Sequence, residues 1–290
     1  MRVPRDEELI KMEGPGGSIL VNVSASPDGK YKIAWSALAM PESGSGKFAL
    51  IYEEQIEYWG EMSVIDHGRI ANNGTFIVSC ILDMNEGVRG IVIMDAQQNV
   101  ILKAVFSSYG GNPGISANGE YACWGQENEI IFYDIYKKNI IWKRPSEIGG
   151  TAFEYDFDTN SKIITTYDDV YGAMDYAFDG KFLDGEKLYQ HRLQSGHYDT
   201  IHQEIERIKQ STDDDEKQKI GRKLFGIISE KWNLESYENQ RPNFARLLGE
   251  MFEAMNMPEK AISSYRQALQ LNPKIGVKRR LTQLEKENGE

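Results

Sequence analysis

The sequence predicts a multidomain chain, with an all-β domain of antiparallel strands followed by an all-α domain. Three observations predict this fold class. A tight-turn pattern recurs about every 45 residues in the first part, and apolar residues recur with helical spacing from Thr200 onward. Two such helical stripes also lie close together within residues 242–275. We therefore place the β-domain at residues 1–190, a linker at 191–199 and the helical domain at 200–290.

The repeat in the first domain begins at a turn rich in residues that favour tight turns. It occurs at Ser26–Gly29, Ala71–Gly74, Ser116–Gly119 and, in weaker form, Asp158–Ser161, and successive copies lie 45, 45 and 42 residues apart. Two residues beyond each turn comes a bulky residue, followed by a stretch of β-branched and aromatic residues. This pattern predicts a strand after each turn.

A second turn signal, an apolar or aromatic residue followed by an acid, keeps a similar spacing. It occurs at Tyr52-Glu53, Met94-Asp95, Tyr133-Asp134 and Phe178-Asp179, where the acids lie 42, 39 and 45 residues apart. Two turns in each repeat predict two hairpins, and hence about four short antiparallel strands in each of four repeats.

Four-stranded repeats of this length resemble β-propeller blades. Tyr133-Asp134 stands where WD40-like repeats often carry Trp-Asp, and the Asp-Gly turns resemble those of TolB-like and quinoprotein-like blades. The resemblance covers roughly residues 16–190. It implies four propeller-like blades that form a small ring, an open arc, or a half that closes by pairing with a second copy. A β-sandwich is the alternative, although it does not require the repeat.

Helices are predicted from about Thr200. Residues Ile201, Ile205 and Ile208 form the first apolar stripe, and Asp213–Asp215 mark a break and an N-cap for the next helix. The apolar face of that helix comprises Ile220, Leu224, Ile227, Ile228 and Trp232. A last helix, from about Lys274, includes Val277, Leu281 and Leu284.

Between these helices, residues 242–275 predict a tight helical hairpin. Its first face comprises Ala245, Leu248, Gly249 and Phe252, and its second comprises Ala261, Tyr265 and Ala268. Small residues at Gly249 and Ala261 allow the two helices to approach closely. Pro242 and Pro258 suit first-turn positions, and Pro273 ends the second helix.

These positions resemble a single tetratricopeptide repeat, with Ala245 in place of the usual Trp. The resemblance implies a hairpin that binds peptides or other helices, within a small helical array. It places Asn243, Arg246, Glu250 and Glu253 on the concave, partner-binding surface. The two glutamates favour a basic or mixed helix as the partner. A solvated helix surface is the alternative interpretation.

Charge is distributed unevenly along the chain, whose formal net charge is −11. The first 190 residues hold 16 basic and 28 acidic side chains, whereas the remainder holds 17 and 16. The acidic first part argues against binding to nucleic acid or an anionic membrane, which requires basic patches. It is compatible with a basic protein partner.

The N-terminus carries no apolar signal region, and no run of residues is long enough for a membrane span. Two cysteines do not make a disulfide framework, so a reduced, cytoplasmic protein is expected. Cys80 lies six residues past Gly74 and Cys123 four past Gly119. Both offsets are even, which predicts that the two thiols share one buried face and act as small apolar residues.

Residues with possible catalytic or metal-binding chemistry are few. His191, His197 and His202 have no zinc-like spacing, so neither a metal nor a cofactor is predicted. Asp66 and His67 are neighbours on a predicted strand and should face opposite sides. Acidic residues could still line a central pocket and act as a general acid and base, and these are Glu53, Glu54, Glu57, Asp66, Asp83 and Glu86.

The function predicted from these patterns is a noncatalytic adaptor or scaffold that binds a protein or peptide through the helical domain, with a second site on the acidic β-domain. No catalytic residue is assigned. Two alternatives remain at this point: a hydrolase with acidic residues in a central pocket, and a self-assembling structural protein in which two copies close a larger ring.

Overall fold

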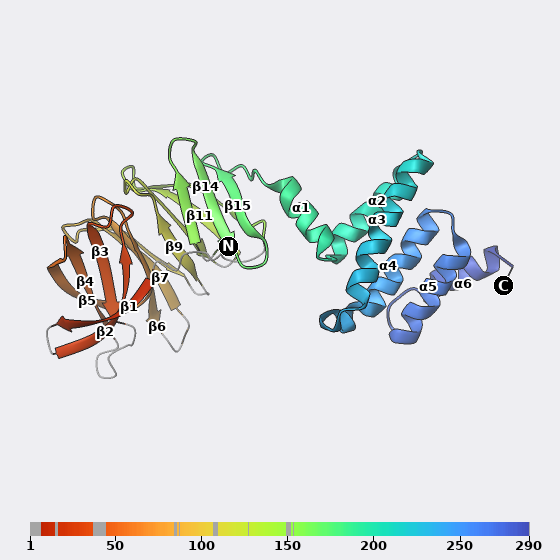
Figure 1. Cartoon of the computed structure of the whole chain (residues 1–290), viewed down its shortest axis with the longest axis horizontal. Helices are drawn as coiled ribbons and strands as arrows, with labels where there is room; N and C mark the ends of the chain where they lie inside the picture. Colours follow the sequence, from red (N-terminus) through yellow and green to blue (C-terminus); the bar gives the residue numbers. More distant parts are fainter. Residues whose placement is uncertain are drawn as a thin grey trace. The chain divides into compact units, whose positions relative to one another are not determined.

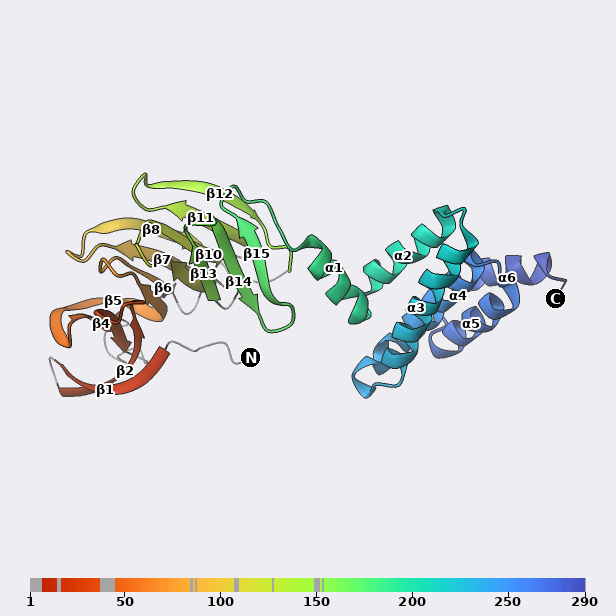
Figure 2. The same cartoon turned by 45° about the horizontal axis from the view of Figure 1, so that its top comes forward.

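A computed structural model of the chain describes residues 7–14, 17–36, 45–83, 86, 88–106, 110–126, 128–148, 152 and 154–289. The chain divides into two compact units, Met1–Asp184 and Gly185–Glu290, shown in Figures 1 and 2. The first unit consists of antiparallel strands and the second of helices, which confirms the predicted order of an all-β part before an all-α part. No helix within the described part is both long and apolar enough to cross a membrane.

Three antiparallel sheets make up the first unit, and each places its strands in sequence order. The largest contains β1 (Glu7–Gly14), β2 (Gly17–Ala25), β3 (Tyr31–Ser36), β4 (Ser45–Tyr52), β5 (Gln55–Ile70), β6 (Phe76–Asp83), β7 (Val88–Met94) and β8 (Val100–Phe106). The second contains β9 (Gly110–Ile115), β10 (Tyr121–Gln126), β11 (Glu129–Asp134) and β12 (Asn139–Pro145), and the third β13 (Glu154–Asp158), β14 (Ile163–Asp168) and β15 (Gly172–Ala177).

Within the described residues none of these sheets closes on itself. The long strand β5 pairs with β4 through its first part and with β6 through its second, so it links two four-stranded segments of the largest sheet. Together with the other two sheets, these make four successive segments. The first runs from β1 to the first part of β5, the second from the second part of β5 to β8, the third is β9–β12 and the fourth is β13–β15. A bridge also joins Tyr176 of β15 to Phe182. The segments pack as layers, visible in Figure 2.

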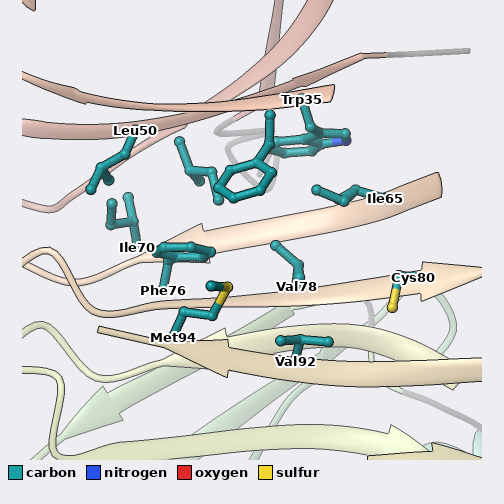
Figure 3. Close-up of a cluster of buried hydrophobic side chains, with 11 residues drawn as sticks. Trp35, Leu50, Ile65, Ile70, Phe76, Val78, Cys80, Val92 and Met94 are labelled. Carbon is teal, nitrogen blue, oxygen red and sulfur yellow. The ribbon is translucent and has the colours of Figure 1, made fainter. Parts of the chain in front are cut away.

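The core of the first unit lies between these layers. Trp35, Leu50 and Phe76 belong to the cluster that joins the first and second segments (Figure 3). A second cluster around Ile93 and Trp124 joins the second and third segments, and a third joins the third and fourth. Both faces of the second and third segments are therefore buried, which explains their nearly continuous apolar runs.

Three of the predicted turns, those that contain Gly29, Gly74 and Gly119, lie side by side along one edge of the layers. Gly29, Gly74 and Gly119 all have φ between 73° and 79°, the left-handed region that glycine adopts without strain. The Asp28 N–H donates to Asn72 Oδ1 at 3.0 Å, and the Asn72 N–H donates to the carbonyl of Ala117 at 2.8 Å. The turns thus hold neighbouring segments in register.

One of these turns is shorter than the others, and this corrects the prediction for the two cysteines. The Ser26 N–H bonds to the carbonyl of Tyr31, five residues on, whereas the Ala71 N–H bonds to that of Thr75, four residues on. Side chains alternate between the two faces of a strand. After a turn that is one residue shorter, residues at an even distance from the turn glycine therefore point to the opposite face from those in the other repeats.

The reversal separates the two thiols. Cys80 faces the first segment and belongs to the Trp35 cluster, whereas Cys123 faces the fourth segment. The expected role as small apolar residues is confirmed, because both cysteines are buried. Burial raises the pKa of Cys80 to about 11 and that of Cys123 well above its ordinary value, so neither thiol is poised as a nucleophile.

The two outer faces of the stack differ in chemistry. On the first segment, Ala34 of β3 and Ala49 of β4 are buried together with Val21 of β2, and Ile10 and Met12 of β1 pack against them. A Cβ placed on Gly14 would lie 2.9 Å from the Trp59 ring, although β1 and β5 are four strands apart in the sheet, so the hairpin must fold over this face.

The outer face of the fourth segment is polar instead. The Tyr167 hydroxyl donates to Asp156 at 2.7 Å, and the Thr165 hydroxyl donates to Asp175 at 2.7 Å. The bond to Asp156, together with partial burial, raises the pKa of Tyr167 to about 12. The stack therefore ends in a covered apolar face at one end and a hydrogen-bonded acidic face at the other.

Asp134, the acid of the third repeat's second turn signal, offers a test of the turn chemistry. Its carboxylate accepts from the backbone N–H and the ammonium of Lys137, each at 2.9 Å. Burial acts to raise the pKa of Asp134, but these bonds outweigh burial and leave the pKa below its ordinary value.

Because the folded-state pKa of Asp134 is lowered, its charged form stabilises the fold above the unfolded-state pKa of about 3.9 and stops doing so as the pH falls through the folded-state pKa. We expect Asp134→Asn to lower the free energy of unfolding of the β-unit by about 1 kcal/mol at neutral pH. Urea titrations followed by tryptophan fluorescence should show the difference shrinking below about pH 4. A difference that stays constant with pH would refute this role.

The second unit contains α1 (Gly185–Gln194), α2 (Tyr198–Gln210), α3 (Asp214–Trp232), the 3₁₀ helix η1 (Glu235–Gln240), α4 (Arg241–Ala254), α5 (Pro258–Leu271) and α6 (Lys278–Glu287). The predicted apolar stripe of α2 is confirmed, since Ile201, Ile205 and Ile208 are all fully buried. Asp213 caps α3 as predicted, because its carboxylate accepts from the N–H groups of Asp215 and Glu216.

The segment predicted as a linker is partly helical. Helix α1 occupies residues 191–194 of the 191–199 segment, and α2 begins at Tyr198. The reason is burial: Leu193 is 1% exposed and packs in the same cluster as Ile201 and Leu224. A residue buried in the helical core fixes the end of α1, so the segment is not a free connection.

Candidate functional site

The helical hairpin α4–α5 positions the residues predicted to bind a partner. A Cβ placed on Gly249 would lie 2.4 Å from the ring of Tyr265, so the bare backbone of α4 lies directly against that ring. Ala245, Ala261 and Ala268 are fully buried in the same region. These small residues bring the two helices together and fix the adjoining polar face of α4.

That polar side forms one wall of an open hollow of about 260 Å³. We call it the charged groove; it is lined by His202 and Lys209 of α2, Arg246, Glu250 and Glu253 of α4, Tyr265 of α5, Gly276 and Val277 of the α5–α6 connection, and Arg280 of α6. Three of the four predicted partner-binding residues are thus brought together. Asn243 is exposed and does not line the groove, although helical spacing places it on the same face of α4, about one turn before Arg246.

Ion pairs organise the charged groove. Arg246 Nε donates to Glu250 Oε1 at 2.7 Å, and Arg280 Nε donates to Glu253 Oε1 at 2.9 Å. Hydrogen bonds to these glutamates raise the pKa of both arginines. Each predicted glutamate is therefore neutralised by an arginine, and the groove does not present an acidic surface.

Two further contacts fix the glutamates. The Tyr265 hydroxyl donates to Glu253 Oε2 at 3.1 Å, and burial, reinforced by this carboxylate, raises the pKa of Tyr265. Glu250 Oε2 is buried and accepts no hydrogen bond from the described residues, and His202 Nε2 lies 3.6 Å from it. Glu250 therefore has one oxygen bound to Arg246 and a second that lacks a donor.

Sequence reasoning did not find the α2 and α6 contributions. His202 lines the groove with a side chain that is 39% exposed, and its lack of a zinc-like spacing gives no indication of this position. Lys209 and Arg280 carry no local signal, because their relation to α4 arises only when the helices pack. Arg280 stands 27 positions after Glu253.

The residues considered for catalysis do not form a comparable site. Glu53 and Glu54 lie in the β4–β5 turn, whereas Asp83 and Glu86 lie at the β6–β7 connection. The Glu53 N–H donates to the carbonyl of Lys30 at 2.9 Å, so this first pair lies beside the β2–β3 turn, on the edge that carries the aligned turns. Within the described residues no group of three or more His, Cys, Asp or Glu side chains is arranged to hold a metal ion.

Asp66 and His67 correct one sequence-based expectation. A bulge in the pairing of β5 with β6 falls between Ile65 and His67. Because a bulge interrupts alternation, the two side chains are not on opposite sides, and His67 Nε2 lies 3.9 Å from Asp66 Oδ1. Asp66 also forms an ion pair with Arg89. The contact with His67 is too long for a hydrogen bond.

Comparisons with known proteins add little to this geometry. No family model matches the chain, and no curated protein matches it. Among solved structures, the chain is similar to Kuenenia stuttgartiensis hydrazine synthase, with a TM-score of 0.38 and 14% sequence identity. The match covers 55% of this chain and 62% of that one, less than two thirds of its length. A likeness this weak bears on neither the fold nor the function.

Proposed function

We propose that this chain is a noncatalytic adaptor whose helical unit binds a polypeptide segment of a partner protein in the charged groove. The convergence of α2, α4 and α6 side chains on one open hollow carries the proposal. At about 260 Å³ the groove is smaller than typical sites for small-molecule ligands, which span roughly 300–1,000 Å³. It suits one or two side chains of a longer segment.

The tetratricopeptide-like interpretation of α4–α5 supports this function. Helices α4 and α5 are joined by a short connection at residues 255–257, and the small residue Gly249 packs under Tyr265. Repeats of this kind stack into arrays whose inner surface binds extended or helical peptides. In this proposal α2, α3 and α6 flank the single repeat and complete its surface.

The charges of the groove suggest a partner of mixed charge. Arg246 and Arg280 neutralise Glu250 and Glu253, and Lys209 is paired with Glu206 at 2.6 Å. A purely basic segment would have to compete with two arginines for the same carboxylates. A segment with both acidic and basic side chains can offer a carboxylate to each arginine and a cation to each glutamate. We therefore favour a partner segment of mixed charge.

We propose that the β-unit is an open, propeller-like arc that presents a second, acidic surface. Support comes from four successive segments of antiparallel strands and from the turns that align along one edge. Closure into a larger ring with a second copy is less favoured, since the end faces do not match. One is covered by the β1–β2 hairpin, and the other carries Glu154, Asp156 and Asp175.

The adaptor function is testable by affinity capture from a lysate of the source cells, with mass spectrometry as the readout. We expect the variant Arg246→Gln/Glu250→Gln/Glu253→Gln to recover its specific partners about tenfold less well, because it keeps polar side chains at the three positions but removes the charges that orient the segment.

The matched control is Arg266→Gln/Glu285→Gln, which removes an exposed ion pair between α5 and α6 outside the groove. It should recover the same partners as the unmodified chain. Far-UV circular dichroism must show both variants folded. Equal recovery by all three proteins would eliminate the charged groove as the binding surface.

A further inference from the structure

A second hollow lies on another part of the helical unit, between α3 and the end of the α4–α5 hairpin. Its volume is about 220 Å³. We call it the methionine groove, and it is lined by Gln218, Gly221, Arg222, Phe225, Met251, Phe252, Met255, Met257 and Lys260. It shares no lining residue with the charged groove.

Apolar side chains form the floor of the methionine groove. A Cβ placed on Gly221 would lie 2.3 Å from Met255 Sδ, so the methionine lies directly against the bare backbone of α3. Phe225 and Phe252 have ring centroids 6.2 Å apart, and Phe225 is 48% exposed. Three methionines provide a floor that adapts to the shape of an inserted apolar side chain.

The rim of the methionine groove is basic. Arg222 is exposed on α3 and Lys260 is exposed at the start of α5. The Lys260 ammonium lies over the Phe252 ring, 5.5 Å from its centroid, and neither cation has a carboxylate partner among the described side chains. Glu259 is exposed next to Lys260 in the sequence but does not line the groove.

Exposed aromatic surface between two cations without carboxylate partners suits one kind of ligand. An apolar side chain would cover Phe225 and the methionines, and flanking carboxylates would reach Arg222 and Lys260. A basic segment would be repelled by both rim cations. The pattern of an apolar anchor with acidic neighbours is that of an acidic amphipathic helix laid in a groove.

We propose that the methionine groove binds an acidic amphipathic segment of another protein, with a leucine, methionine or phenylalanine side chain inserted beside Phe225. This site goes beyond the charged groove and would let the helical unit hold two segments of different chemistry. Its occupant is a separate protein; a second copy of this chain, with its own acidic β-unit, is the competing occupant.

The test uses the full-length chain and a short fluorescein-labelled peptide of glutamates with leucines spaced three and four residues apart. Fluorescence anisotropy should show saturable binding that weakens as salt is raised, because the rim cations are exposed. A peptide with lysine in place of every glutamate should bind about tenfold more weakly or not at all. Equal binding of both peptides, or no saturable binding of the acidic one, would overturn the proposal.

Variants locate the binding to this groove. Phe225→Ser and Arg222→Glu should each weaken the acidic peptide about tenfold, and neither should unfold the chain, because both residues are exposed. Lys219→Glu is the matched control: it makes the same charge change on α3 outside the groove and should bind nearly as well as the unmodified chain. Equal losses for Lys219→Glu and Arg222→Glu would reduce the effect to net charge and refute the site.

Two further measurements separate the competing interpretations. The charged-groove variant Arg246→Gln/Glu250→Gln/Glu253→Gln should bind the acidic peptide normally, so failure of one proposal leaves the other intact. Sedimentation over a range of concentrations should show no self-association that depends on Phe225: the unmodified chain and Phe225→Ser should behave alike. Such self-association would identify a second copy as the occupant and overturn the proposed partner.

Discussion

Replacing Gly249 with valine should destabilise the helical unit by about 3 kcal/mol, the upper end of the cost of overpacking a well-packed core. The added Cβ would lie 2.4 Å from the Tyr265 ring. That ring is 2% exposed and its hydroxyl is bound to Glu253, so it cannot move away cheaply. Urea unfolding of the full chain, followed by far-UV circular dichroism, measures the loss.

Gly226→Val is the control for this experiment. Gly226 lies within α3 and has no atom within 4 Å of an added Cβ, so the same substitution meets open space. Its effect should stay within about 0.5 kcal/mol, because only helix propensity changes. Equal losses for the two variants would show that the contact between Gly249 and Tyr265 is not what holds the hairpin together.

The second large effect is expected at the hairpin that covers the first segment of the β-unit. Ile10 and Met12 are partly buried against Val21, Ala49 and their neighbours. Replacing both with serine should lower the stability of the β-unit by roughly 2 kcal/mol through lost apolar burial. It should also loosen the hairpin from the face beneath it, so that the chain self-associates in sedimentation experiments.

Lys11→Ser/Glu13→Ser is the matched control, because these residues alternate with Ile10 and Met12 on β1 and are exposed. That variant should remain monodisperse and nearly as stable as the unmodified chain. If the two double variants behave alike, the β1–β2 hairpin does not protect the first segment.

The sequence predicted features that depend on neighbours along the chain. The Asp213 cap, the stripe of α2 and the tight turns that end at Gly29, Gly74 and Gly119 all follow from local rules. The order of a β-part before an α-part follows from a change in hydrophobic period. These signals extend over a few residues, so no knowledge of the packed structure is needed to recognise them.

Features set by packing were missed or misplaced. Arg280 reaches the charged groove only because α6 packs beside α5, and no pattern around it indicates this. The bulge at Asp66–His67 and the buried Leu193 of α1 likewise depend on strands and helices that lie elsewhere in the sequence. Arg246, Glu250 and Glu253 could be placed on one face of α4 from helical spacing alone, and their role in binding a partner stays a prediction.

The short turn at Ala71–Thr75 has a consequence for how the repeats could be exchanged or duplicated. The length of the turn sets the alternation of the side chains in the strand that follows. It therefore decides whether Phe76 and Cys80 point toward the first segment or toward the third. If the longer Ser26–Lys30 connection replaced the turn of the second repeat, the alternation would shift by one residue. The side chains of β6 that now face the first segment would then face the other side of the sheet. The strands and turns of this chain are therefore transferable only as matched sets.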